Sequence, residues 1–419
     1  MDKRELQRWP LYAWMVGNAI SFMGNRLTNL AIPWFVLETT GSMAQAGVTG
    51  FFSLLPIVLA AFFGGPIIER VGYKRVSVIS DILSGVTVAL IPLLYSTVGL
   101  AFWQLQVLVF LGAFLDAPGS TARSAMVPEL SQAAQVPLER ANALTQVLER
   151  LGFLVGPLMG GVLIGILGAS NVLWINAGTF LISAVLIGSG IPSRLIPAPK
   201  PSAGGHWAGY VADLKEGMRF VRTQRLIFVM IAGITVTNFL ESPSFSVFLP
   251  AYAEQILGSS TALGAIASAF AAGAMIGAGL YAAVGPRLSR RLVYLSAWLV
   301  AAVPQLIVAQ LPPLPVIVAL VALIGLGSGP INPIISTVIQ ERVPFEMRAR
   351  VFGMARSLAW MAMPLGPMIG GYVAEAIGLQ AAYSILAVLY LLAALGQLFI
   401  REMREMDGAP KPAESPVRA

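Results

Sequence analysis

Long apolar stretches recur along the whole chain and limit its possible folds more than any other feature. A hydrocarbon core of about 30 Å requires roughly 20 apolar residues in one helix. Twelve segments meet this requirement, with approximate limits of 11–37, 45–69, 76–97, 101–125, 141–167, 170–191, 225–252, 260–285, 290–310, 313–339, 350–375 and 378–400. We therefore predict an all-α polytopic membrane protein with twelve transmembrane helices.

Composition supports this class and excludes others. The 419 residues are 57% hydrophobic and 11% charged, whereas soluble domains carry about 25% charged residues. The net charge of +7 comes from basic residues that lie between apolar segments and not on one polar face, so no nucleic-acid partner is expected. The chain has no cysteine and a single histidine, His206, so we predict no metal, no cofactor and no enzymatic activity.

The basic residues predict the orientation in the membrane. Of the 27, Arg26, Arg123, Arg150 and Arg356 lie within predicted spans. The others lie at the termini, in the links after the second, fourth, sixth, eighth and tenth spans, or at the start of the spans that follow these links. Because basic residues are retained on the cytoplasmic side, both termini are predicted to be cytoplasmic. The expected location is the plasma membrane, the inner membrane of a bacterium.

The chain also repeats itself in register with span number. GPLMGG at 156–161 recurs as GPMIGG at 366–371, each time in the fifth span of its half. We predict two six-helix halves in parallel repeat, residues 1–191 and 225–400. A cytoplasmic linker at 192–224 joins them, and a tail at 401–419 is predicted to be disordered.

The second part of the linker has apolar residues at helical spacing, with basic residues opposite. This pattern predicts an interfacial helix on the cytoplasmic leaflet, either as a tether between the halves or as a regulatory docking site. Its apolar residues are Trp207, Tyr210, Val211, Leu214, Met218 and Val221.

A short charged link, FFGGPIIERVGYKRV at 62–76, separates the second and third spans. Glycine permits close helix approach and a tight turn, and the charged residues require water. The pattern resembles the signature loop of the major facilitator superfamily of transporters, although Glu69 stands where that family usually has aspartate. The matching residues are Gly65, Glu69, Arg70, Gly72, Lys74 and Arg75.

The resemblance implies a cytoplasmic gate. In it, the loop residues would contact Asp81, Arg123 and the start of the eleventh span near Arg350 and Arg356, and this latch would hold the outward-facing state. The counterpart of the loop in the second half, GLYAAVGPRLSRR, keeps its basic residues but has no acid. The resemblance therefore implies a latch on one side only.

The fifth span contains small residues four apart and a proline. Small residues let a neighbouring helix approach, and proline bends the helix that contains it. The pattern resembles the antiporter motif of drug:proton exchangers in the same superfamily, which implies export, while helix packing alone is the alternative. Its residues are Gly152, Gly156, Pro157, Gly160 and Gly161.

Charged residues at membrane depth are costly and usually functional, at about 2.5–3.5 kcal/mol each on insertion scales. Arg26, Asp116 and Glu241 lie midway along the first, fourth and seventh spans. The resemblance implies that these helices and the tenth line a central cavity for substrate and protons. Asn238 and Asn332 add polar groups to the seventh and tenth.

One hypothesis pairs Arg26 with Asp116 or Glu241 in one state and leaves the other acid free to take a proton or to face a cationic substrate. Burial disfavours the charged form of a carboxyl group, which suits a proton carrier. The alternative is a static ion pair that fixes helix packing. Glu149 and Arg150, adjacent on the fifth span, are candidates for a structural ion pair with the first or eighth span, or for a functional role.

Three phrases narrow the resemblance to the macrolide-efflux and enterobactin-exporter branch: ARSAMVPEL at 122–130, ERANALTQ at 139–146 and LKEGMRFVRTQ at 214–224. It implies a monomeric secondary active exporter of amphipathic small molecules, driven by protons and surrounded by membrane lipid. Exporters or flippases of a siderophore or a lysophospholipid are the alternative, and a non-transporting membrane sensor is a remote one. Sodium coupling and uniport also stay open.

Overall fold

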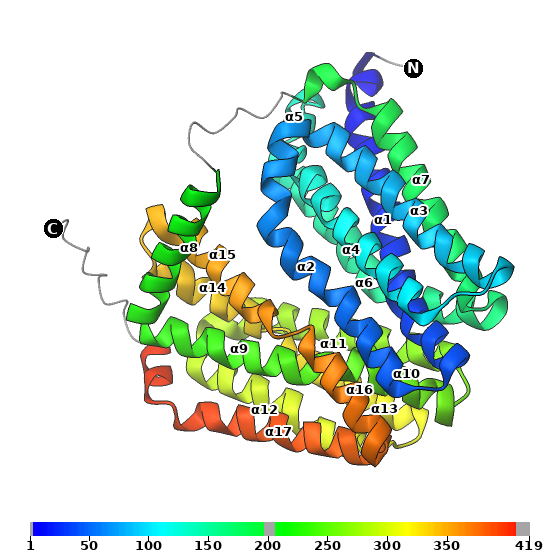
Figure 1. Ribbon diagram of the computed structural model, residues 1–419. Helices are drawn as coiled ribbons and strands as arrows, with labels where there is room; N and C mark the ends of the chain where they lie inside the picture. The colour runs from blue at the N-terminus through cyan, green and yellow to red at the C-terminus, as the bar shows by residue number, and fades with distance from the viewer. Residues whose placement is uncertain (1–2, 197–205, 408–419) are drawn as a thin grey trace. The chain divides into compact units, whose positions relative to one another are not determined.

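The computed structural model describes residues 3–196 and 206–407, and within these ranges every regular element is helical. Ten helical segments of the described chain are long and apolar enough to cross a membrane. The other two predicted spans, 11–37 and 350–375, fall on α1 (Lys3–Thr40) and on α15 (Phe345–Met361) with α16 (Leu365–Ile377). The predicted all-α membrane class is confirmed (Figure 1).

The remaining helices follow the predicted spans in order. They are α2 (Met43–Val71), α3 (Tyr73–Thr97), α4 (Phe102–Ala125), α5 (Val127–Ala133), α6 (Leu138–Leu167), α7 (Ala169–Gly190), α8 (His206–Thr223), α9 (Arg225–Pro243), α10 (Leu249–Ala251), α11 (Ser260–Val284), α12 (Arg290–Val308), α13 (Leu314–Ser328), α14 (Ile331–Arg342) and α17 (Leu379–Phe399). A 3₁₀ helix, η5 (Arg401–Met406), follows α17.

Glycine makes the sharpest of the turns between consecutive helices. Gly72 has φ of 90° between α2 and α3, in a region that other residues rarely adopt. Gly168 and Gly378 have almost the same conformation, with φ of 83° and 87°, at the corresponding junctions α6–α7 and α16–α17. The recurrence of this turn between the fifth and sixth spans of each half agrees with the internal repeat of the sequence.

By their internal contacts the residues form two compact units. The first unit is Met1–Ala203 with Ser246–Ser268, and the second is Gly204–Phe245 with Ala269–Ala419. In the first, α3 packs against α4 and α7, and α1 packs against α6. In the second, α12 packs against α13 and α17, and α9 packs against α16, which is the same pattern of neighbours. The predicted boundaries at 191, 224 and 400 stay predictions.

Proline lies at the breaks in three of the predicted spans, and in the eleventh Pro364 caps α16. The tenth span breaks between α13 and α14, where Pro330 caps the second piece. The seventh span continues from α9 through two π-helical turns, Ser244–Phe248 and Tyr252–Ile256, which begin beside Pro243 and after Pro250. Proline removes a backbone donor and clashes with the preceding turn, so these breaks have a local cause.

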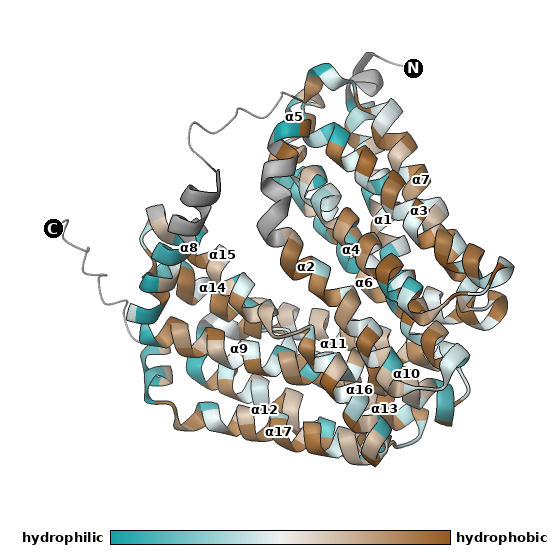
Figure 2. Cartoon of the chain, viewed as in Figure 1, coloured by the Kyte–Doolittle hydropathy of each residue, from teal (hydrophilic) through white to brown (hydrophobic). Residues whose placement is uncertain are grey.

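The linker forms α8, as predicted, and Figure 2 shows hydrophilic residues along its coloured part. The side chains at 206–214 lie outside the described residues, and so do those of the predicted tail from 408 onward. Val221 is fully buried and packs with Met218 against Ile227 of α9 and Val351 of α15. This face of α8 is therefore covered by protein of the second unit, to which α8 itself belongs, and the tether stays a prediction.

Candidate functional site

A buried ion pair lies at the centre of the first unit. The Nη1 group of Arg123, near the end of α4, donates to Asp81 Oδ1 of α3 at 2.6 Å. The two side chains are 3% and 0% exposed. Ser183 of α7 donates to the other carboxylate oxygen at 2.7 Å. Two charges can be buried together here because each has a close partner of opposite sign or a hydrogen-bonding neighbour.

Arg123 extends this pair into a network toward α1. Its Nε donates to Asn18 Oδ1 at 3.2 Å, and its Nη2 lies 3.4 Å from Asp116 Oδ1. Asn25 of α1 donates to Asp116 Oδ2 at 3.0 Å. Trp14 donates to the backbone oxygen of Arg123 at 3.0 Å. Two residues predicted for the gate, Asp81 and Arg123, thus join one network with Asp116, which was predicted for the cavity.

Three members of this network were missed by pattern reasoning. Asn18, Asn25 and Ser183 lie in apolar spans, and buried polar groups of this kind need hydrogen-bond partners. Their polarity at membrane depth is the signal that could have found them. Which charged side chain each would meet depends on how the helices are rotated, and the sequence does not state this.

Arg26 forms no ion pair with Asp116 in this structure, and the hypothesis of such a pair in one state of the cycle stays a prediction. Its guanidinium carbon lies 4.6 Å from the ring centroid of Phe22 and 4.2 Å from that of Phe153. Among the described residues its Nε is buried without a hydrogen-bond partner. Asp116 is held by Asn25 and Arg123 instead. Aromatic faces attract a cation, so the two rings hold the guanidinium between them.

The glycines of the fifth span let α6 approach its neighbours closely. A Cβ on Gly156 would lie 2.7 Å from Arg26 Cβ, and one on Gly152 would lie 2.8 Å from the Phe22 ring. Gly160 faces Leu27 and Leu30 of the same helix, α1. In the second copy of the motif, Gly366 faces the backbone of α9 in the same way. Pro157 lies inside α6, between these contacts.

Gly161 meets a different element, the beginning of α11. Ser260 Oγ donates to the Gly161 carbonyl at 2.9 Å. A Cβ on Gly161 would lie 2.5 Å from the Ser260 backbone oxygen and 3.0 Å from Gly264 Cα. Both atoms belong to backbone and cannot rotate away. The two helices therefore touch through their main chains, which only small residues allow.

Replacing Gly161 by alanine is expected to lower the free energy of unfolding by about 1–3 kcal/mol, the usual cost of overpacking. Gly178 of α7 is the matched control, since no atom lies within 4 Å of a Cβ placed there. Thermal unfolding of both purified variants in detergent measures the difference. Equal midpoints for the two alanine variants would show that the contact between α6 and α11 is not tight.

Glu241 lies in the second unit, toward the end of α9. Its Oε1 is buried and has no hydrogen-bond partner among the described residues. Tyr383 and Tyr390 of α17, both buried, lie close enough to feel its charge. Asn238 of the same helix donates to the Ala359 carbonyl at 3.0 Å, while Asn332 of α14 is exposed.

The charged link between α2 and α3 is described only in part. The contacts of Gly65 and the side chain of Glu69 lie outside what the structure describes, so their predicted roles in the gate stay predictions. Arg70 and Arg75 are exposed, and Lys74 lies 3.5 Å from the Ser193 hydroxyl. Asp81, a predicted partner of this loop, pairs with Arg123.

The basic residues expected at the other end of the latch have partners within the second unit. Arg350 contacts Glu216 of α8 at 2.6 Å, and Arg356 lies over the ring of Trp360 at 5.0 Å.

The counterpart of the charged link in the second half, GLYAAVGPRLSRR, joins α11 to α12. Acids from other elements contact its last residues. Glu341 of α14 accepts two hydrogen bonds from Arg290, at 2.5 and 2.8 Å. Asp407 accepts from the Ser289 hydroxyl at 2.5 Å and from the Arg291 backbone N–H at 3.3 Å, at the beginning of α12. An acid at a helix N-terminus satisfies free N–H groups. Glu341 of α14 is thus the acid that pairs with a basic side chain of this loop, while Asp407 caps the beginning of α12.

The polar contacts of the described residues are typical of sites that hold or move charge, and they differ from the catalytic groups that make or break covalent bonds. No group of three or more metal-ligating side chains occurs among the described residues. The polar side chains form hydrogen-bonded and ionic networks inside apolar helices, and none of the described contacts pairs a nucleophile with a histidine base.

Comparison with known proteins agrees with this picture. A family model described as Major Facilitator Superfamily matches residues 14–260 and 231–419. The chain is 35% identical to the "Multidrug efflux pump Tap" of Mycolicibacterium fortuitum over 415 residues, which cover 97% of this chain and 99% of that protein. It is 22% identical to "Macrolide efflux protein A" of Streptococcus pyogenes over 410 residues, 97% of this chain and 100% of the other.

Solved structures show the same fold. The crystal structure of the nucleoside transporter NupG superposes with a TM-score of 0.74 at 14% identity and covers 95% of this chain and 98% of that one. A bacterial homologue of the human lysosomal transporter Spinster, inward-facing and unoccupied, gives a TM-score of 0.68 at 16% identity, covering 98% and 100%. At these identities the likeness concerns the fold alone.

Proposed function

The chain belongs to the Major Facilitator Superfamily, and on that premise we propose that it exports amphipathic small molecules across the membrane in which it is embedded. The family confirms the predicted resemblance and makes the protein a transporter and not an enzyme. The relatives named for multidrug and macrolide efflux match over nearly their full length, and that likeness carries the proposal.

The finer mechanism that we propose is proton-coupled antiport by alternating access, in which two halves move about a midplane site. The termini would be cytoplasmic, as the basic residues predict, and a monomer would suffice. Two features support proton coupling. One carboxyl oxygen of Glu241 is buried and has no hydrogen-bond partner among the described residues. Asp116 belongs to a network of charged and polar groups. Residues in both positions could exchange a proton during transport.

Purified protein in liposomes with an imposed pH gradient and an internal pH dye tests this function. A panel of lipophilic cations, macrolides and lysolipids would be added in turn. Net movement of at least one compound with coupled proton flux is the expected result. Movement without proton flux would replace antiport by a facilitator or flippase, and movement of lysolipids alone would favour the lipid exporter. No movement of any compound would contradict the proposed function.

A further inference from the structure

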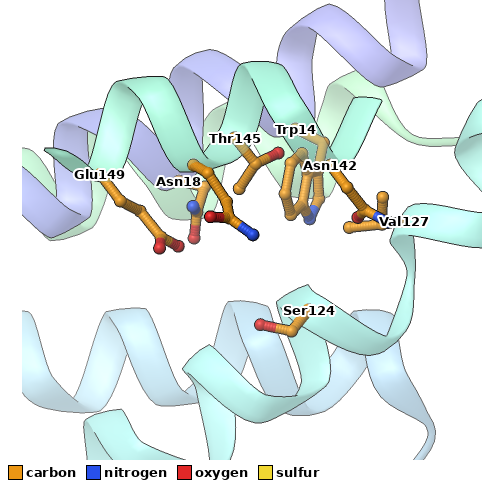
Figure 3. A pocket seen from close by; sticks show the side chains of 8 residues that line it. Trp14, Asn18, Ser124, Val127, Asn142, Thr145 and Glu149 are labelled. Carbon is orange, nitrogen blue, oxygen red and sulfur yellow. The ribbon is translucent and has the colours of Figure 1, made fainter. Parts of the chain in front are cut away.

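A half-open pocket of about 200 Å³ lies in the first unit, between α1, the end of α4 with α5, and α6. Figure 3 shows Glu149, Thr145 and Asn142 of α6 together with Asn18 and Trp14 of α1, facing Ser124 across the gap. Gln146 and Val127 complete the lining. The pocket is polar although α6 is one of the apolar membrane-spanning candidates.

The pocket exists because α1 and α6 are in close contact along only part of their length. Gly152, Gly156 and Gly160 bring α6 against α1. Toward the beginning of α6 the same face continues as Glu149, Thr145 and Asn142, at spacings of three and four residues. These side chains are too large for close approach, so the interface opens into a wedge. Polar and charged residues in a membrane-spanning helix raise the free energy of insertion, and such residues usually have a function.

The lining combines one carboxylate with amide and hydroxyl groups. The carboxylate of Glu149 makes no hydrogen bond or ion pair with any residue that the structure describes. The Thr145 and Ser124 hydroxyl hydrogens are used on the backbone oxygens of Ala141 and Ser120, so their oxygens face the pocket as acceptors. No lysine or arginine lines the pocket. It therefore offers one negative charge beside hydroxyl and amide oxygens, which can accept from a cation with several N–H donors.

We propose that this pocket captures the cationic group of an exported substrate, an amine, amidine or guanidine, with Glu149 as its counter-ion. Its volume is below the roughly 300–1,000 Å³ of sites that enclose drug-sized molecules, so it holds one charged group while the rest of the ligand extends through the opening. The inference rests on the proposed export function, because it names the charge and the donor chemistry of the substrate.

The pocket adjoins both charged features of the first unit. Asn18 lines it and also accepts from Arg123. The acids whose charges act on Arg26 are Asp116 and Glu149. A cation bound at Glu149 would cancel the attraction of that carboxylate for Arg26 and leave only that of Asp116, which is the stronger of the two. Ligand capture would in this way shift the balance of charge toward the Asp116–Arg123 network.

Ligand-observed NMR titration of the full-length protein in nanodiscs tests the pocket with three probes of one shape. Benzamidinium carries a charge and N–H donors, benzamide is neutral and benzoate is an anion. Benzamidinium is expected to bind best, and Glu149→Gln to weaken it about tenfold, the loss of one charge-assisted interaction. Glu139→Gln, an exposed acid one turn before the pocket, is the control and should bind like the unmutated protein.

Asn142→Leu provides a second variant that keeps the charge and removes an acceptor, with an expected loss of about threefold, within the range of one neutral hydrogen bond. Equal benzamidinium affinity in the unmutated protein, Glu149→Gln and Asn142→Leu would overturn the proposal. So would a loss found in Asp116→Asn and absent from Glu149→Gln. Because binding is measured without transport, such a result leaves export standing, whereas a failed liposome assay with intact binding rejects export alone.

Discussion

Glu241→Gln is expected to abolish substrate-dependent proton flux while the protein remains folded. Glutamine keeps the shape of the side chain and cannot release a proton. A buried charge without a partner is unstable, and Glu241 Oε1 has none among the described residues, so a proton can be added there without breaking a hydrogen bond. At Asp116 a proton would have to compete with Asn25 and Arg123. The internal pH dye in proteoliposomes measures the flux.

Glu254→Gln is the matched control for this substitution. Glu254 also has a buried carboxyl oxygen without a hydrogen-bond partner in the described structure, but it lies in the first unit, in the last π-helical turn of the seventh span. We expect it to keep proton flux. If Asp116→Asn loses the coupling and Glu241→Gln retains it, the carrier is Asp116. Loss in neither variant would contradict the role of both acids.

The second large effect is expected on stability. Asp81→Ala should lower the free energy of unfolding by about 3–5 kcal/mol, because it leaves Arg123 buried without its nearest counter-charge. Asp116 compensates only in part, since its closest contact with Arg123 is 3.4 Å and its side chain is 20% exposed. Unfolding in mixed micelles with increasing SDS measures the change in the purified protein.

A second substitution separates the cost of an unpaired charge from simple loss of packing. Arg123→Met in the Asp81→Ala background removes the cation that has lost its nearest counter-charge and keeps much of the side-chain volume. Part of the lost free energy of unfolding should therefore return. If the double variant is as unstable as the sum of the two single variants, the ion pair contributes no coupling energy. Arg75→Ala, an exposed cation near α3, should change little.

The same pair explains why the first unit can act as one body. Asp81 and Arg123 join α3 to α4, Ser183 adds α7, and the bonds from Asn18 and Asn25 add α1. Hydrogen bonds inside a low-dielectric interior are costly to break, so these helices have a strong reason to move together. This fits the proposed rocking of halves and makes the Asp81 variant informative for transport as well as for stability.

The gross architecture could be predicted without coordinates because it follows from composition and period. Runs of about 20 apolar residues require helices in a bilayer, since every backbone group must be satisfied within the segment. The repeat of GPLMGG as GPMIGG predicted two related halves, and the contacts of α1 with α6 and of α9 with α16 show the same relation. Gly72 was expected at a turn and has the positive φ that this turn requires.

Partners of charged side chains could not be predicted, because they depend on helix rotation and packing. Sequence placed Arg26 at membrane depth. Of the two phenylalanine rings that contact its guanidinium, one is on the same helix, α1, but the other is on α6, more than a hundred positions later. The acid missing from the second loop is supplied by Glu341 of α14, 51 positions after Arg290. By itself, the sequence determined which segments are helical, how many cross the membrane and that they repeat. Only the tertiary structure decided which charge meets which, since a side chain's neighbours are set by contacts across helices and not by position along them.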